Sequence, residues 1–209
     1  MYSKLYQGKI KGEPHIKLSV YSPPNLDRPT FKEATSHTFT RTNRGAEFGP
    51  SWSTHWFKVQ VTLPDSLANK SHLEFHWDAD NEGLVWSEHG EPLQGLTGGG
   101  ERVEWIIPSE FRDGREHTFY VEMACNGMFG VGKHGDSIQP PDMERYFKLK
   151  QAEVVAVNLQ ARALKTDFQI ISGENISEED VAARRLIRGR CGKRVSRGLL
   201  GGTRGTYGC

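Results

Sequence analysis

The side chains best suited to acid–base chemistry lie close together in the first half of this 209-residue chain. Two carboxylates facing each other across a cleft can hydrolyse a glycosidic bond. The stretch in question holds five of them, those of Asp78, Asp80, Glu82, Glu88 and Glu91. Acidic residues in a loop between strands are usually solvated, so we predict that these five form no catalytic pair.

Two metal-like spacings occur in the same region, and neither predicts a metal site. His72 and His76 are four residues apart, as two ligands on one helix face would be, but they lie in a strand pattern that points position 76 to solvent. The acidic run from Asp78 to Gly83 resembles the start of a calcium loop. Its twelfth position, which requires Glu, is His89. We predict no metal-binding residue and no cofactor-binding residue in this chain.

Two further candidates for chemistry are a glycine run and a cysteine. Gly98–Gly100 is followed by no Lys-Ser/Thr pair and by no helix, so it is not a phosphate-binding loop. Cys125 comes at the end of a predicted strand, with no histidine near it in sequence. A buried free thiol is therefore favoured over a nucleophile. We predict no catalytic residue.

Aromatic residues offer a different kind of site. Trp52 and Trp56 flank a Ser-Thr-His segment and could form a platform on which a sugar ring stacks, although tryptophans at a strand entrance more often pack in a core or an interface. Asn126 and Phe129 lie in a glycine-rich loop after the last predicted strand. We predict that these four residues contact either a neighbouring domain or a sugar.

Alternating apolar residues indicate the elements that position these groups. Four runs have period 2 and are separated by turn residues, namely Phe57–Leu63, Leu73–Trp77, Val103–Ile107 and Phe119–Met123. The pattern predicts a mainly β fold, an antiparallel sandwich whose sheets each have one buried and one solvated face.

The chain divides into four predicted parts. Residues 1–47 form an arm with one strand, at residues 16–20, and residues 48–150 form the sandwich. Residues 151–188 are a helical segment, with Asn158 as the N-cap of a helix that ends at Gly173 and a second short helix from Ser177 to about Ile187. Residues 189–209 are rich in Arg and Gly, and we expect them to be disordered.

Charge and composition narrow the partners and the compartment. From Arg184 onward the chain has eight Lys and Arg and no acidic residue, which leaves 19 Lys and Arg against 26 Asp and Glu before it. This acidic body argues against nucleic acid as a partner. No apolar run is long enough to span a membrane, the N-terminus lacks the apolar core of a secretory signal, and three cysteines form no disulfide framework. These features favour a reducing compartment.

Four blocks of sequence resemble one known family. The blocks FGPSWSTHWFKVQVTLP, GEPLQGLTGG, ACNGMFGVG and PPDMERYF are similar, in wording and order, to the N-terminal region of cytosolic and vacuolar α-mannosidases of glycoside hydrolase family 38, with the fungal vacuolar type the most similar. The resemblance covers roughly residues 5–172. It implies a jelly-roll β-sandwich that precedes a catalytic domain, with the following helix leading towards that domain.

The resemblance also implies what the chain does and does not do. The family removes terminal α-linked mannose from oligosaccharides with a bound zinc, but its catalytic and zinc-binding motifs have no counterpart in this sequence. We therefore expect a non-catalytic domain, inactive alone, that packs on the missing catalytic domain and shapes its active site. A stand-alone carbohydrate-binding module that binds oligomannose is the alternative. The family also implies homo-oligomers and a cytoplasmic location, or delivery from the cytoplasm to the vacuole. The abrupt basic tail suggests a truncated or frame-shifted gene model.

Overall fold

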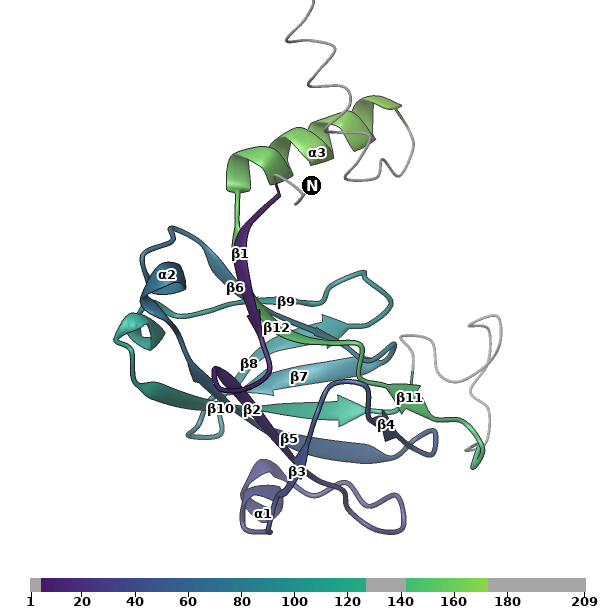
Figure 1. Ribbon diagram of the computed structural model, residues 1–209. Helices are drawn as coiled ribbons and strands as arrows, with labels where there is room; N and C mark the ends of the chain where they lie inside the picture. The colour runs from purple at the N-terminus through teal and green to yellow at the C-terminus, as the bar shows by residue number, and fades with distance from the viewer. Residues whose placement is uncertain (1–4, 127–141, 173–209) are drawn as a thin grey trace, which may run out of the picture. The chain divides into compact units, whose positions relative to one another are not determined.

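The computed structural model describes residues 5–126 and 142–172. The chain divides into two compact units, one spanning Gly8–Val157 and one that joins the residues up to Gln7 to the chain from Asn158 onward. The first and larger unit contains nearly all of the β-structure (Figure 1).

A six-stranded sheet forms one layer of the larger unit. Its neighbouring strands pair antiparallel throughout. In spatial order they are β3 (Thr40–Thr42), β2 (Ile16–Tyr21), β5 (Thr54–Thr62), β10 (Glu116–Ala124), β7 (Glu82–Trp86) and β8 (Pro92–Thr97).

A four-stranded sheet forms the other layer. Its order is β1 (Tyr6–Lys11), β12 (Gln151–Val157), β6 (Leu73–Asp78) and β9 (Glu104–Ile106). A small separate ladder joins β4 (Glu47–Phe48) to β11 (Phe147–Lys148). Short helical turns connect strands, namely α1 (Phe31–Thr35), α2 (Asp65–Ala68) and η1 (Ser109–Arg112). The predicted fold class, a mainly antiparallel β-sandwich, is confirmed.

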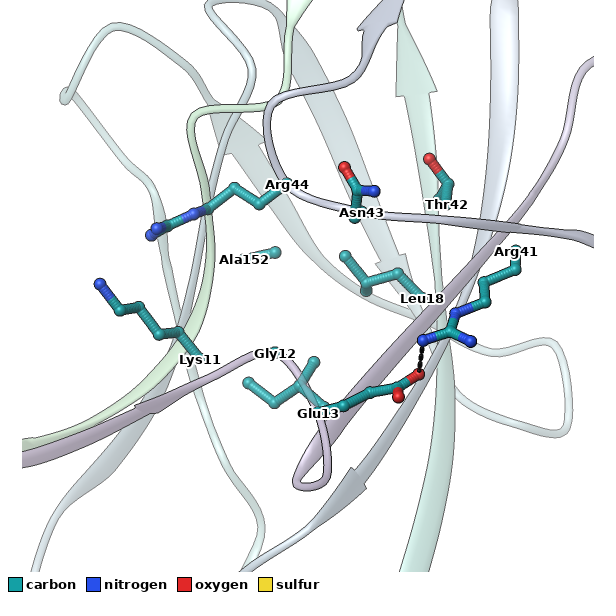
Figure 2. A pocket seen from close by; sticks show the side chains of 10 residues that line it. Lys11, Gly12, Glu13, Leu18, Arg41, Thr42, Asn43, Arg44 and Ala152 are labelled. Atoms are coloured by element: carbon teal, nitrogen blue, oxygen red, sulfur yellow. Dashed lines mark ion pairs between the residues drawn. The ribbon is translucent and has the colours of Figure 1, made fainter.

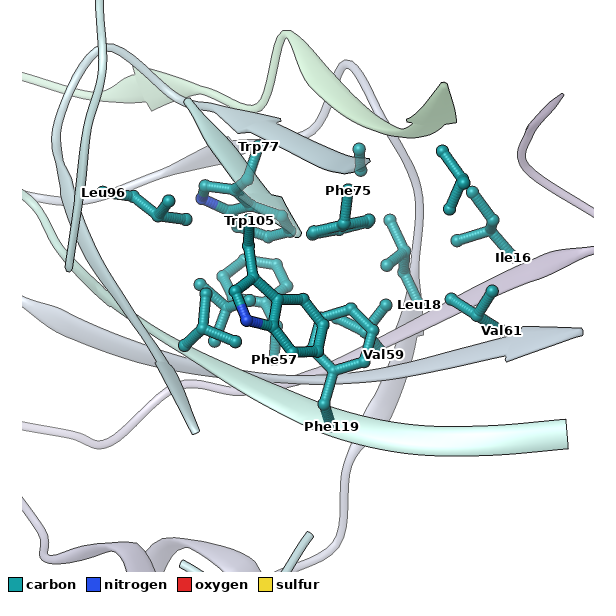
Figure 3. Packing of buried hydrophobic residues seen from close by; sticks show 14 of the residues in the cluster. Ile16, Leu18, Phe57, Val59, Val61, Phe75, Trp77, Leu96, Trp105 and Phe119 are labelled. Carbon is teal, nitrogen blue, oxygen red and sulfur yellow. The ribbon is translucent and has the colours of Figure 1, made fainter. Parts of the chain in front are cut away.

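Aromatic rings from both sheets fill the space between them (Figure 3). The Phe57 ring of β5 meets the Trp77 ring of β6 edge to face, with centroids 4.7 Å apart. Phe119 of β10 meets Phe75 of β6 in the same way at 4.9 Å, and its ring lies 4.8 Å from that of Trp105. Each such ring buries on the order of 150–250 Å². These cross-sheet pairs define the inner faces of β5, β6, β9 and β10.

Three of the four alternating runs have the predicted inner and outer faces, but β6 does not. All six of its residues are buried, including the polar Glu74, His76 and Asp78. The prediction that position 76 points to solvent is therefore wrong. β6 is an interior strand of its sheet, between β12 and β9, and its second face is also covered.

The sequence pattern missed several strands. β7 and β8 flank an acidic turn without a clean alternation, and β1 and β3 lie in the segment predicted to hold one strand. The prediction is wrong for β12. Gln151–Val157 is predicted to belong to a helical segment, but it forms a strand that pairs with β6 from Gln151 to Ala156. Its residues from Ala152 to Val157 are all buried. A strand buried on both faces has no alternation to detect.

The smaller unit contains α3, which spans Leu159–Ser172. The Asn158 Oδ1 accepts a hydrogen bond from the Ala161 N–H at 3.1 Å, which confirms the predicted N-cap. The predicted second helix and the basic tail lie outside the described residues. Among the residues that the structure describes, no helix has the length and apolar character needed to cross a membrane.

Candidate functional site

The outer face of the six-stranded sheet has a cluster of aromatic side chains, which we call the outer aromatic cluster. Even-numbered residues of β5 and β10 point to this face, opposite to the core residues of the same strands. Its members are Tyr21, Phe31, Phe39, Trp56, Trp86 and Tyr120.

Helix α1 supplies the ring at the centre of this cluster. Phe31 lies 5.9 Å from the Trp56 ring, 5.7 Å from the Trp86 ring and 5.3 Å from the Tyr120 ring. The helix is held by a capping box in which Thr30 and Glu33 bond each other's backbone N–H groups. As a result only 1% of Trp56 is exposed, and its ring faces are occupied by protein.

A polar group lies beside the aromatic rings. Glu122 of β10 is partly buried, and its carboxylate accepts a hydrogen bond from the Trp86 indole N–H at 3.1 Å. Burial raises the pKa of Glu122, while the Trp86 bond and the nearby Arg28 charge act in the opposite direction. The raised pKa favours the neutral acid of Glu122. In the described part of the chain, this carboxyl group is not paired with a second carboxylate, as an acid–base pair would require.

Trp52 and Asn126 come together at the end of the sheet. The Trp52 N–H donates to the Cys125 carbonyl at 2.9 Å, and Trp52 has a φ of +69°, a left-handed conformation that costs energy for a bulky residue. The Arg28 guanidinium lies 5.8 Å from the centre of the Trp52 ring. The Asn126 amide donates to Glu82 at 2.5 Å. Phe129, the fourth predicted contact residue, lies outside the described residues.

Ser53 links Cys125 to a histidine, although none is near Cys125 in sequence. The Cys125 N–H donates to the Ser53 carbonyl, and Ser53 Oγ lies 2.9 Å from His55 Nε2. Burial nevertheless raises the pKa of the Cys125 thiol to about 11, and burial lowers the pKa of His55 to about 4. A neutral thiol is a poor nucleophile, and the neutral His55 has little tendency to take up its proton, which supports the interpretation of Cys125 as a buried free thiol.

The two histidines with metal-like spacing bind one carboxylate instead. Glu74 Oε1 lies 2.7 Å from His72 Nε2, and Glu74 Oε2 lies 3.0 Å from His76 Nε2. Both imidazoles therefore turn to the buried glutamate between them. Within the described ranges no three side chains of ligand type gather. The zinc that the family resemblance implies does not fit the residues present in this part of the chain.

The carboxylates between positions 78 and 91 each have a separate local role. Asp78 Oδ1 accepts from the N–H groups of Asp80 and Gly99, at 2.9 and 3.1 Å. Asp80 pairs with Lys150. Glu88 and Glu91 are exposed in the turn between β7 and β8. These groups are thus bound to the backbone or to a lysine, or lie in solvent, and do not face each other as a pair.

The glycine run has a packing explanation. A Cβ on Gly98 would lie 2.4 Å from the Asn81 nitrogen and 2.7 Å from the Asp80 Cα, closer than real contacts allow. Gly98 also donates its N–H to the Asn81 carbonyl at 2.8 Å. The close approach of two loop backbones, and not phosphate binding, requires glycine there.

A pocket of about 350 Å³ lies elsewhere in the larger unit and was not predicted (Figure 2). Its lining joins the turn between β1 and β2 to β3 and the loop after it. Three basic residues surround it, namely Lys11 at the end of β1, Arg41 of β3 and Arg44 in the loop after β3. Lys11 is far in sequence from Arg41 and Arg44, and the three follow no motif, so only the fold brings Lys11 to the other two.

Comparisons with known proteins place the sandwich in one family. The family model described as α-mannosidase, jelly roll domain, matches residues 13–155. α-Mannosidase 2C1 of Homo sapiens is 38% identical over 171 residues, and an α-mannosidase of Saccharomyces cerevisiae is 44% identical over 158 residues. These alignments cover 80% and 72% of this chain. They cover only 16% and 14% of the two relatives, so the chain spans about one seventh of their length.

Solved structures show a weaker likeness. A β-glucuronidase from Ruminococcus gnavus in complex with D-glucuronic acid has a TM-score of 0.47 and 16% identity, over 75% of this chain and 32% of that one. At this level the likeness carries no argument about function.

Proposed function

We propose that this chain, which belongs to the α-mannosidase family through its jelly roll domain, is a non-catalytic N-terminal domain. It packs on the catalytic part of an α-mannosidase and shapes the mouth of its active site. The complete enzyme would release terminal α-linked mannose from oligosaccharides. The domain itself contributes contacts and stability rather than chemistry.

The main support for this proposal is that the candidate chemical groups of the sandwich are occupied by structural partners. Cys125 and His55 are held in their neutral forms, Glu74 is shared by two histidines, and Asp78 caps a turn. Such an arrangement gives stability to a loop-rich sandwich and leaves no nucleophile beside an active base in the described part.

Exposed apolar side chains support a role in packing. Ile106 of β9 is 58% exposed, and Met143 and Tyr146 are 59% and 56% exposed. In the smaller unit, Ile170 and Ile171 of α3 are 75% and 81% exposed. Large apolar groups that remain in water often mark the surface that another domain covers. α3 would then lead towards the catalytic domain, as the sequence resemblance implies.

An activity assay gives a rapid test. The purified 209-residue chain is incubated with p-nitrophenyl α-mannoside, with and without added zinc. We expect no p-nitrophenol above the rate of a buffer blank in either condition. Turnover that rises in proportion to protein concentration and survives a second purification step would refute the non-catalytic proposal.

A second candidate function, a carbohydrate-binding module, rests on Trp52. Its indole is partly exposed, and the Arg28 guanidinium lies over its ring. Asn126 and Glu82 add polar groups at the same end of the sheet. Aromatic faces beside hydrogen-bonding groups are typical of sugar sites. Trp56 is buried under Phe31, so Trp52 is the tryptophan of the pair that a sugar ring would reach.

Isothermal titration with mannose and α-mannobiose separates the two candidates. Saturable heat that disappears in Trp52→Ala, but not in a Trp86→Phe control, would favour the module. No heat for the wild-type chain would leave the packing role as the function. Either result is independent of the activity assay.

The remaining features of the proposal concern location and assembly. We place the parent enzyme in the cytoplasm or, after delivery from the cytoplasm, in the vacuole, and we propose that it forms homo-oligomers. The sandwich reaches beyond the predicted boundaries near residues 47 and 150, because β2, β3 and β12 belong to its sheets. The boundary near residue 188 is part of the same proposal. These points rest on the family and on the sequence pattern.

A further inference from the structure

The pocket of Figure 2 lies where the edges of the two sheets meet. Its floor is apolar and comes from both layers, with Ile16 and Leu18 from β2 and Ala152 from β12. All three residues are buried. Its volume of about 350 Å³ falls at the lower end of the range of small-molecule sites.

The rim of this pocket is cationic. Lys11, Arg41 and Arg44 line it against a single carboxylate, that of Glu13, which pairs with Arg41 at 2.7 Å. Figure 2 shows this ion pair on one side and the ends of Lys11 and Arg44 on the other. The charge surplus of these four groups is therefore about two, since three positive charges face one negative charge.

A buried carboxylate behind the rim holds one of the cations in place. The Glu153 side chain is 6% exposed and accepts from Arg44 Nη1 at 3.4 Å and from Lys9 Nζ at 3.0 Å. Lys9 and Glu153 compensate each other, so the surplus of two is unchanged. Arg44 retains donors that point to no described partner, and Lys11 forms no ion pair within the described residues. Both can donate to a ligand.

Backbone bonds fix the two loops that present these groups. The Gly45 N–H donates to the Leu149 carbonyl at 2.8 Å, which ties the loop after β3 to the strand region before β12. The Ile16 N–H donates to the Gly12 carbonyl at 2.9 Å across the turn between β1 and β2. Gly12 has a φ of +68°, which glycine adopts without strain. A site on such anchored loops loses little entropy on binding.

We propose that this pocket binds a small organic phosphate monoester. Its phosphate would lie between Lys11 and Arg44, and its body would rest on Ile16, Leu18 and Ala152. A phosphate monoester has a charge of about −1.5 to −2 at neutral pH, which balances the excess of about two positive charges at the rim. A single carboxylate would balance only half of that excess. Arginine and lysine together are the usual donors to phosphate oxygens.

The test is a ¹H–¹⁵N titration of the 209-residue chain with three probes: phenyl phosphate, inorganic phosphate and benzoate. We expect saturable shifts at Gly12, Thr42 and Asn43 with phenyl phosphate, and roughly tenfold weaker binding of benzoate, because it has half the charge. Inorganic phosphate should bind the same residues more weakly, because it lacks a body for the apolar floor. Equal affinity for benzoate and phenyl phosphate would overturn the proposal, as would the lack of saturation.

Variants complete the test. Lys11→Gln and Arg44→Gln are exposed changes that should each weaken phenyl phosphate binding about fivefold to tenfold. Lys32→Gln, an exposed lysine of α1 outside the pocket lining, is the matched control and should bind as the wild type does. Unchanged affinity in both pocket variants, or equal loss in the control, would show that the shifts do not come from this pocket.

Discussion

At the level of single residues, the environment of each reactive group decides its chemistry more than its type does. Cys125 shows this clearly. Its thiol is buried. Burial raises the pKa of this thiol to about 11, while a free cysteine has a pKa near 8.5. The same thiol in an electropositive, accessible position would be a candidate nucleophile.

We therefore predict that Cys125 reacts slowly with a thiol reagent in the folded protein. In a variant with Cys191→Ser and Cys209→Ser, the rate of labelling at pH 8 should be at least about 100-fold lower in buffer than in 8 M urea, because the folded thiol is both covered and protonated. The measurement is the absorbance of released thionitrobenzoate. Equal rates in the two conditions would contradict the burial of this thiol.

His55 gives a prediction about pH. Burial lowers its pKa to about 4, while an unfolded histidine titrates near 6.5. Between these values the unfolded chain binds more protons, so stability is lost as the pH falls from about 6.5 towards 4. From pH 7.5 to pH 5 this group should lower the free energy of unfolding by about 2 kcal/mol. Urea unfolding at the two pH values measures the change.

A pair of variants isolates this effect. His55→Asn should reduce the difference in unfolding free energy between pH 7.5 and pH 5, because the titrating group is gone. His89→Asn, at an exposed turn position, should leave the difference as in the wild type. An undiminished pH dependence in His55→Asn would assign the effect to other groups.

At the level of elements, the short helix α1 has a larger role than its five residues suggest. It covers part of the outer face of the six-stranded sheet with one ring, that of Phe31. Phe31→Ala should lower the free energy of unfolding by about 2–3 kcal/mol, because three ring contacts are lost and Trp56 gains water. Its tryptophan emission should shift to longer wavelength. Lys32→Ala, exposed on the same helix, should change neither quantity by much.

The helix α3 depends on its cap in a comparable way. Asn158→Ala removes the side-chain bond to the Ala161 N–H and should cost about 1 kcal/mol of local helix stability. The expected readout is a smaller helical signal at 222 nm without a shift of the main unfolding transition of the sandwich. Gln160→Ala, an exposed change in the same turn, serves as the control. A full helical signal in Asn158→Ala would show that the cap is dispensable.

Three strands with one solvated face were predicted correctly, and the two strands with both faces covered were not. The runs in β5, β9 and β10 alternate because solvent meets one side of each. β12 has a continuous buried run, and β6 buries polar residues on its second face, so period 2 is lost or misleading. The outer aromatic cluster did leave a signal, since Trp56 and Tyr120 are aromatic at positions where a wet face would be polar.

At the level of the whole molecule, the fold class and the family followed from the sequence, but the location of candidate sites did not. Lys11, Arg41 and Arg44 are ordinary charged residues in the sequence, and only the meeting of two sheet edges makes a pocket of them. Conversely, the carboxylates near Asp78 are dense enough in the sequence to suggest chemistry, yet they have local structural roles in space. The contact roles predicted for Trp52, Trp56, Asn126 and Phe129 stay predictions.

The proposed packing of this domain on a catalytic part is tested most directly by restoration of activity in trans. A Saccharomyces cerevisiae α-mannosidase lacking the region that aligns with this chain is assayed on p-nitrophenyl α-mannoside, alone and with the purified 209-residue chain added. We predict low activity for the shortened enzyme, none for the chain alone, and recovery that saturates as the chain is added. Activity of the chain alone, or a shortened enzyme that is fully active and unaffected by the chain, would contradict the proposed non-catalytic packing role.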